Sequence, residues 1–263
     1  MNFFKMAGSG NDFVVIDNRE NIIKDRAKTA IALCNRKFGI GADGLLLVEN
    51  SKIADIRMRI FNPDGSEAEM CGNGLRCIML FAVSRKITKG NSINVETGAG
   101  VLRGSVKGKR VKAQLKLGGV PKLVKIPLEK KNITGYFINT GVPHTVIFTT
   151  SIEKVDVNGE GPVIRYHKLF KPKGTNVDWI EVVDTNTIKI RTYERGVEGE
   201  TLSCGTGSVA GAIAGFLKGR VSPPVKVISR SGEILAVYFD TAIENAYLEG
   251  DILTIFKGEW LGR

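Results

Sequence analysis

The chain contains the stretch Met70-Cys71-Gly72-Asn73-Gly74-Leu75-Arg76-Cys77 and, in its second half, the related stretch Ser203-Cys204-Gly205-Thr206-Gly207. In each half an alternating strand comes first, at residues 56–61 or 188–193, and a polar turn follows it. Further along, residues 95–100 match residues 227–232, and the offset between the halves stays constant to within one residue. A repeat that keeps its offset indicates an internal duplication into two similar halves.

Each Cys-Gly-x-Gly segment leads into a helix without a polar face, predicted over residues 72–86 and 207–218. Because such helices are buried, we expect an α+β fold of two similar domains, each with β-strands wrapped around a central apolar helix. The predicted domains are residues 1–118, joined by the C-terminal segment 250–263, and residues 119–249. The active site is expected in the cleft between them.

An amphipathic helix is predicted over residues 25–38, ended by Gly39, and is expected to cover the outside of the first domain. The residues expected on its buried face are Ala27, Ile31, Cys34 and Phe38. This position gives Cys34 a structural role.

Composition and charge exclude several classes of protein. The 263 residues are 43% hydrophobic, but no apolar run is long enough to cross a bilayer and the start of the chain lacks a signal peptide. We expect a soluble, cytoplasmic protein with no membrane partner. The net charge of +11 is dispersed, and its densest part, residues 107–116, alternates like a strand with one solvated face, so we expect no nucleic-acid partner.

The four cysteines, Cys34, Cys71, Cys77 and Cys204, are expected to be free thiols in a reducing compartment. The chain has no Cys-x-x-Cys pair and only two histidines, neither at ligand spacing from a cysteine, so we expect no metal site. The chain also has no recognisable lysine environment or glycine-rich phosphate loop for an organic cofactor.

Cys71 and Cys204 each precede the first turn of a predicted helix. Unpaired backbone N–H groups and the positive end of the helix dipole stabilise a thiolate there, so we expect a lowered thiol pKa. The same N–H groups bind carboxylates. If both thiols face one ligand, a thiolate can remove a proton from one face of a carbon while a thiol protonates the other face. This pattern favours inversion of a carbon centre.

The chain resembles the diaminopimelate epimerase family almost end to end, with the motifs in family order. The matching segments are Gly8-Ser9-Gly10-Asn11-Asp12-Phe13, residues 70–77, Gly174-Thr175-Asn176-Val177-Asp178, Tyr193-Glu194-Arg195-Gly196 and residues 203–207. The resemblance implies interconversion of LL- and meso-diaminopimelate for lysine and peptidoglycan synthesis, without pyridoxal phosphate or metal. A homodimer is also expected.

The resemblance assigns roles to the matching residues. Cys71 is expected to accept the α-proton of the LL substrate and Cys204 to donate one, with the roles exchanged in reverse. The residues expected to hold the reacting carboxylate are Asn11, Gly72, Asn73, Gly205 and Thr206. The residues expected to bind the distal amino-acid end are Asn62, Asn176 and Arg195. The residues expected to orient the reacting amino acid near the thiols are His144 and Glu194.

Two positions depart from the common family pattern, because Gly44 stands where many members have glutamine and Val142 where many have asparagine. One alternative is a proline or hydroxyproline racemase-like enzyme, whose first motif typically reads Cys-Gly-His-Gly, and Asn73 argues against it. Another is a thiol-regulated small-molecule-binding protein in which Cys71 and Cys204 form a reversible disulfide. A third is a basic adaptor for nucleic acid.

Overall fold

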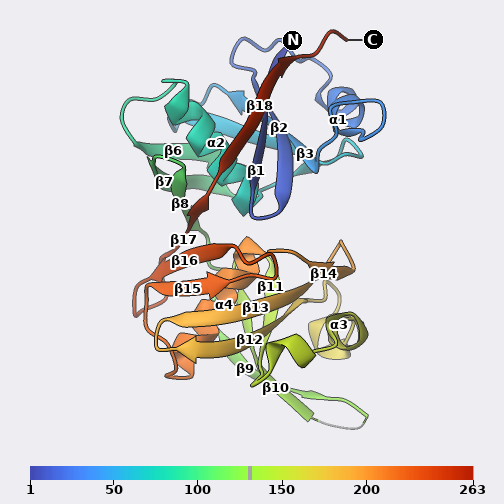
Figure 1. The fold of residues 1–263 in the computed structure, drawn as a ribbon, viewed down its shortest axis with the longest axis vertical. Helices are drawn as coiled ribbons and strands as arrows, with labels where there is room; N and C mark the ends of the chain where they lie inside the picture. The colour runs from blue at the N-terminus through green and yellow to red at the C-terminus, as the bar shows by residue number, and fades with distance from the viewer. Residues whose placement is uncertain (130–131, 263) are drawn as a thin grey trace. The chain divides into compact units, whose positions relative to one another are not determined.

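The computed structural model describes residues 1–129 and 132–262, and the chain divides into two compact units (Figure 1). Unit 1 consists of Met1–Gln114 and Gly250–Arg263, and unit 2 of Leu115–Glu249. The sequence analysis placed the boundary four residues later. Within the described ranges, no helix is both long and apolar enough to span a membrane.

Unit 1 is a set of strands around one helix (Figure 1). Its elements are β1 (Asn2–Gly8), β2 (Asn11–Asp17), α1 (Arg26–Cys34), β3 (Gly44–Glu49), β4 (Ile56–Phe61), β5 (Glu67–Ala68), α2 (Gly72–Ser84), β6 (Ser92–Thr97), β7 (Gly100–Lys107), β8 (Arg110–Leu115) and β18 (Leu253–Glu259). The strands pair in the order β18-β1-β2-β3-β4-β6-β7-β8, with β5 also on β4. The pairs β2–β3 and β4–β6 are parallel. Helix α2 contacts β1, β2, β3, β4, β6 and β7, so it is the central helix.

Unit 2 repeats this arrangement strand for strand. Its elements are β9 (Lys122–Pro127), β10 (Asn132–Asn139), β11 (Pro143–Phe148), η1 (Ile152–Lys154), α3 (Val157–Arg165), η2 (Lys168–Phe170), β12 (Asn176–Asp184), β13 (Thr187–Glu194), β14 (Gly199–Thr201), α4 (Gly205–Leu217), β15 (Val225–Ile228), β16 (Ile234–Phe239) and β17 (Ala246–Asp251). The order is β9-β10-β11-β12-β13-β15-β16-β17, with β14 on β13 and with β11–β12 and β13–β15 parallel. The predicted duplication and α+β fold are confirmed.

The two central helices are buried nearly all round, as their apolar sequences predict. Helix α2 ends two residues before the predicted end, and α4 begins two residues before the predicted start because Cys204 is its N-cap. One buried residue of α2 is charged: Arg76 is 0% exposed. Sequence periodicity did not indicate this cation in the core of unit 1.

The predicted outer helix is shorter than expected and buries a different face. Helix α1 ends at Cys34 because Asn35 adopts an extended backbone and its side-chain oxygen accepts hydrogen bonds from the next turn. Its buried residues are Ala30, Leu33 and Cys34. Phe38 is 70% exposed, so the predicted face with Ala27, Ile31 and Phe38 is wrong, while Cys34 is buried as expected.

Candidate active site

Cys71 and Cys204 occupy the same position at the start of their helices. Each is the N-cap, with an extended backbone at φ −141°, ψ 120° for Cys71 and φ −124°, ψ 111° for Cys204. The Cys71 sulfur accepts the Gly74 N–H (3.5 Å) and the Cys204 sulfur accepts the Gly207 N–H (3.4 Å). Each thiol therefore lies against the unpaired N–H groups of a first helical turn, where an anion is stabilised.

Burial changes the ionisation expected at Cys204. The side chain is only 7% exposed, and this burial raises the pKa of the Cys204 thiol. The negative charges of Glu194 and Asp178 raise it further, while the hydrogen bonds from Thr206 and Gly207 lower it by less. The prediction of a lowered pKa is wrong for this thiol, because desolvation outweighs the helix N-terminus.

Beside Cys71, the side-chain amide of Asn73 is held in one orientation. Arg76 is a donor only, and its Nη2 bonds the Asn73 Oδ1 at 2.8 Å. The Asn73 Nδ2 then donates to the Asn11 Oδ1 (2.8 Å), and the Asn11 Nδ2 donates to Asp43 (3.1 Å). Both amide oxygens are occupied, and each amide keeps one N–H without a partner among the described residues. Such a pair suits a carboxylate, which only accepts.

Fixed charges support this amide chain. Asp43 accepts a 2.7 Å hydrogen bond from Arg36, which also binds Asp12. Asp12 pairs with the buried Lys5 at 2.6 Å. Burial alone would raise the pKa of Asp12, but the hydrogen bonds from Arg36 and Lys5 lower it to about 2. Asp12 is therefore an ionised acceptor for both cations at neutral pH.

Beside Cys204, the neighbours include a buried histidine. His144 is 0% exposed, and its Nδ1 lies 2.7 Å from the Asp178 Oδ2. Its Nε2 lies 3.0 Å from the Thr206 Oγ1, which in turn lies 3.4 Å from the Cys204 sulfur. The other Asp178 oxygen accepts from the Thr192 hydroxyl (2.8 Å). A continuous hydrogen-bond chain thus leads from Asp178 to Cys204.

The residues predicted for the distal end lie in both units. In unit 2, the Asn176 Oδ1 accepts the Arg195 backbone N–H (2.7 Å), and its Nδ2 donates to the Pro143 carbonyl (3.1 Å). The Arg195 guanidinium donates to the Lys173 carbonyl (3.2 Å) and makes no ion pair with any residue in 1–129 or 132–262. In unit 1, Asn62 directly follows β4 and its Nδ2 donates to the Ser66 hydroxyl (2.9 Å).

Glu194 ends β13, directly before Arg195. Burial raises the pKa of the Glu194 carboxyl, which interacts electrostatically with His144 and Asp178. It therefore belongs to the group of titratable side chains around Cys204.

Gly72 and Gly205 are the first residues of α2 and α4. Of the two departures from the family pattern, Gly44 packs tightly, because an added Cβ would lie 3.1 Å from the Phe61 carbonyl oxygen. Val142 precedes β11 and its carbonyl accepts the Thr140 N–H (3.1 Å).

The sequence analysis assigned no role to seven side chains of these two networks, which are Lys5, Asp12, Arg36, Asp43, Arg76, Asp178 and Thr192. Asp178 lies inside one of the family motifs, but nothing in the spacing showed that it binds His144. The repeat offered a signal, because the offset between the halves places Thr192 opposite Ile60 and Asp178 opposite Leu46.

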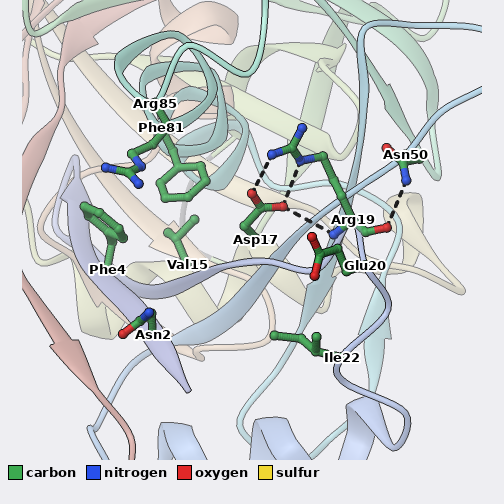
Figure 2. A pocket seen from close by; sticks show the side chains of 10 residues that line it. All are labelled: Asn2, Phe4, Val15, Asp17, Arg19, Glu20, Ile22, Asn50, Phe81 and Arg85. Atoms are coloured by element: carbon green, nitrogen blue, oxygen red, sulfur yellow. Dashed lines mark hydrogen bonds and ion pairs between the residues drawn. The ribbon is translucent and has the colours of Figure 1, made fainter.

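A pocket of ≈ 470 Å³ lies elsewhere in unit 1 (Figure 2). Its lining includes Arg85, which caps the C-terminal end of α2 and lies over the Phe4 ring, and Arg19, which binds Asp17 at 2.8 Å. None of the predicted site residues lines it. Because Cys71 caps the opposite end of the 13-residue helix, roughly 20 Å away, this pocket is separate from Cys71. Within the described ranges, no cluster of three or more His, Cys, Asp or Glu side chains could bind a metal ion.

A duplicated α+β fold with thiols at matching N-cap positions suits an isomerase that inverts a carbon centre. The family model described as diaminopimelate epimerase matches residues 3–123 and 136–252. The chain belongs to the diaminopimelate epimerase family. It is 45% identical to the diaminopimelate epimerase of Aquifex aeolicus, over 98% of this chain and 97% of that protein. It is 41% identical to that of Methanocella arvoryzae, over 98% of this chain and 95% of that protein.

Solved structures with this fold have more distant sequences. A Bacillus anthracis protein of the PhzF phenazine-biosynthesis family superposes with a TM-score of 0.72 at 17% identity, covering 100% of this chain and 99% of that chain. A hydroxyproline epimerase from Agrobacterium vitis superposes with a TM-score of 0.68 at 14% identity, covering 98% of this chain and 91% of that chain. At these identities the likeness concerns the fold alone.

Proposed function

We propose that the chain interconverts LL- and meso-diaminopimelate by a two-base mechanism in which Cys71 and Cys204 act on opposite faces of one α-carbon. The observation that carries the proposal is the identical N-cap position of the two thiols in corresponding places of the two units. Family membership supports the substrate. No cofactor is required, since the reaction needs one thiolate, one thiol and donors for the carboxylate.

In the direction from LL to meso, the Cys71 thiolate removes the α-proton and the Cys204 thiol protonates the other face. The negative charge that develops on the reacting carboxylate is stabilised by the first-turn N–H groups at Gly72 and Gly205. The remaining N–H groups of Asn11 and Asn73 add donors at fixed positions. Because their oxygens are already bonded, these amides favour a carboxylate over an amide or an ammonium group.

The distal amino-acid end is assigned to Asn62, Asn176 and Arg195. The Arg195 guanidinium has no carboxylate partner among the described residues, so it can form a charge-assisted bond to the distal carboxylate. Asn176 fixes the backbone of Arg195 through a 2.7 Å hydrogen bond. This assignment distinguishes diaminopimelate from amino acids that have no second carboxylate.

The direct test follows the substrate α-proton by NMR in deuterated buffer. We expect LL- and meso-diaminopimelate to exchange the proton and to interconvert. Proline, hydroxyproline and lysine serve as controls and should keep theirs. Turnover of proline instead would remove the substrate assignment and leave only the two-thiol chemistry. Ligand binding without any exchange would favour a thiol-regulated binding protein.

We further propose a homodimer in the cytoplasm. The four cysteines are free, as a reducing compartment requires. The outer strand β18 presents the apolar side chains Leu253, Ile255 and Phe256, which are about half exposed, and such an edge is a site of association. Light scattering after gel filtration should give twice the chain mass of 28.6 kDa. A Phe256→Lys variant should shift towards the monomer.

A further inference from the structure

The strand registers show which residues of the two units correspond. In unit 1, Leu46 pairs with Val15 on one side and Ile60 on the other. In unit 2, Asp178 pairs with Val146 and Thr192 in the same places. A Cβ added to Gly74 would meet Leu46 and Ile60, and one added to Gly207 would meet Asp178 and Thr192. The corresponding pairs are Leu46 with Asp178, Ile60 with Thr192 and, by the same register, Phe13 with His144.

A comparison of the corresponding positions shows which side chains the fold requires and which ones serve the thiol. Unit 1 supports the first turn of its central helix with three buried apolar side chains. Unit 2 uses a carboxylate, a hydroxyl and an imidazole, and Asp178 and His144 are each 0% exposed. Burying such groups is costly unless each one is hydrogen-bonded. Because the same backbone forms with apolar residues, the polar trio serves Cys204 and not the fold.

The hydrogen bonds determine the tautomer of His144. An ionised carboxylate only accepts, so the Nδ1 that faces Asp178 at 2.7 Å carries the proton. The Nε2 is then an acceptor, which agrees with its two neighbours, the Thr206 hydroxyl at 3.0 Å and the Asn176 Nδ2 at 3.4 Å. When the Thr206 hydroxyl donates to Nε2, its oxygen can accept the S–H of Cys204, 3.4 Å away.

We propose that Asp178 is a positioning residue that fixes His144 as the Nδ1–H tautomer, and that His144 and Thr206 form a proton relay that converts Cys204 between thiol and thiolate. The inference rests on the proposed function, which needs Cys204 as a thiol for the LL substrate and as a thiolate for the meso substrate. In the relay, the Cys204 proton moves to the Thr206 oxygen as the Thr206 proton moves to the His144 Nε2. One S–H and one O–H bond break, one O–H and one N–H bond form, and no other reactant is needed.

The electrostatic surroundings explain why a relay is useful. Burial raises the pKa of Cys204, so the thiolate would seldom form by loss of the proton to solvent. The imidazolium that the relay creates faces the Asp178 carboxylate from β12 and interacts with Glu194 from β13. Both carboxylates therefore act on Cys204 as well as on His144.

The first test is the tautomer itself, observed by nitrogen-15 NMR of the imidazole rings in the free enzyme at pH 7. The chain has two histidines, and His167 is an internal reference. Its Nδ1 accepts the Leu169 N–H and its Nε2 faces the Pro127 carbonyl, so it is the opposite, Nε2–H tautomer. We expect one ring of each kind, and His167→Gln should remove only the Nε2–H ring. An Nε2–H tautomer or an imidazolium at His144 would overturn the proposal.

The second test is kinetic. Asp178→Asn should lower kcat about 100-fold with KM changed less than about threefold, because acid–base assistance is lost while binding groups remain. Thr206→Val should lose a similar factor, whereas Thr206→Ser keeps the hydroxyl and should recover most of that loss. One limb of the kcat/KM pH profile reports the ionisation of the Cys204–His144 pair. In the Asp178→Asn variant, the apparent pKa of this limb should also change. Equal loss in the Ser and Val variants would indicate a packing role for Thr206 and contradict the relay.

Alkylation of Cys204 by iodoacetamide, followed by peptide mass spectrometry at pH 7, separates the relay from simple charge effects. If His144 assists ionisation, Asp178→Asn should slow the alkylation about tenfold. If Asp178 acts only through its negative charge, its removal should speed the alkylation, and this result would overturn the proposal. These thiol and tautomer measurements do not use diaminopimelate. A wild-type chain that fails to epimerise diaminopimelate would therefore contradict the proposed function separately.

Discussion

The two helix ends with Cys71 and Cys204 share a backbone and differ in what surrounds it. At Cys71, the neighbouring Asn73 is held by the buried cation Arg76 and, through Asn11, by a network of fixed charges. At Cys204, the neighbouring Thr206 is held by a histidine that can gain or lose a proton. The duplicated backbone provides two equal thiol positions. The side chains that diverged around them give one end fixed donors and the other a titratable partner.

The largest expected effect comes from removing either thiol. Cys204→Ala and Cys71→Ala should each lower epimerisation about 10³- to 10⁴-fold with the fold intact, because one remaining base cannot protonate the opposite face. The two variants should differ in a second measurement, α-proton exchange in deuterated buffer. Cys204→Ala should still exchange the LL substrate without inversion, and Cys71→Ala the meso substrate.

Cys34→Ala is the control for these thiol variants, since Cys34 is buried on the inner face of α1 and should not affect turnover. Near-normal epimerisation in either Cys71→Ala or Cys204→Ala would contradict the two-base mechanism. Exchange of the same substrate isomer by both variants would contradict the assignment of one face to each thiol.

A smaller effect is expected at the distal end of the substrate, for which we propose Arg195 of unit 2 as the charged partner. Arg195→Ala should lower kcat/KM for diaminopimelate about 10- to 100-fold, because a hydrogen bond between charged groups is worth about 1.5–3 kcal/mol. The change should appear mainly in KM. Arg230→Ala removes a surface arginine that binds Glu153 and should leave the kinetics unchanged. Equal losses in the two variants would remove Arg195 from the substrate site.

Features of the fold and of the candidate site could be predicted from the sequence where their physical cause is local, and could not be predicted where it depends on tertiary contacts. The duplication and the central helices were predictable, because apolar periodicity and a constant offset are local signals. The buried face of α1 was not, since the side chain of Asn35 ends the helix before Phe38. The thiols were predictable from their glycine motifs, but the raised pKa of Cys204 depends on burial and on carboxylates from other strands. Partners such as Arg76 and Asp178 are set by tertiary contacts that spacing does not encode.

Two kinds of substitution at the corresponding positions under the first turns of α2 and α4 should affect stability in opposite ways. A polar residue is placed in unit 1, and apolar residues are placed in unit 2. Leu46→Asp places a carboxylate without a partner in the core of unit 1, and we expect a loss of about 3–5 kcal/mol in the free energy of unfolding. The triple variant His144→Phe, Asp178→Leu, Thr192→Ile copies the apolar trio of unit 1 into unit 2. It should unfold at the same or higher urea concentration, since replacing a buried charged network by apolar groups is often neutral or stabilising. Its activity should be lost. A strongly destabilised triple variant would show that the polar trio is needed for the fold.

The smallest effect concerns Cys77, whose place in α2 corresponds to that of Ala210 in α4, six residues after the N-cap in each helix. Burial raises the pKa of Cys77 to about 12, whereas a thiol in the unfolded chain has a pKa of about 8.5. The folded state therefore holds its proton more tightly, so this contribution to stability is complete below pH 8.5 and is lost as the pH rises towards 12.

Cys77→Ala should cost about 1–2 kcal/mol at pH 7, where only the lost volume matters. Between pH 8 and pH 10, however, the wild type should lose about 2 kcal/mol more than the variant, measured by urea unfolding under reducing conditions. An equal loss in both would mean that Cys77 ionises as readily in the folded protein as in the unfolded chain, contrary to its burial in the core of unit 1.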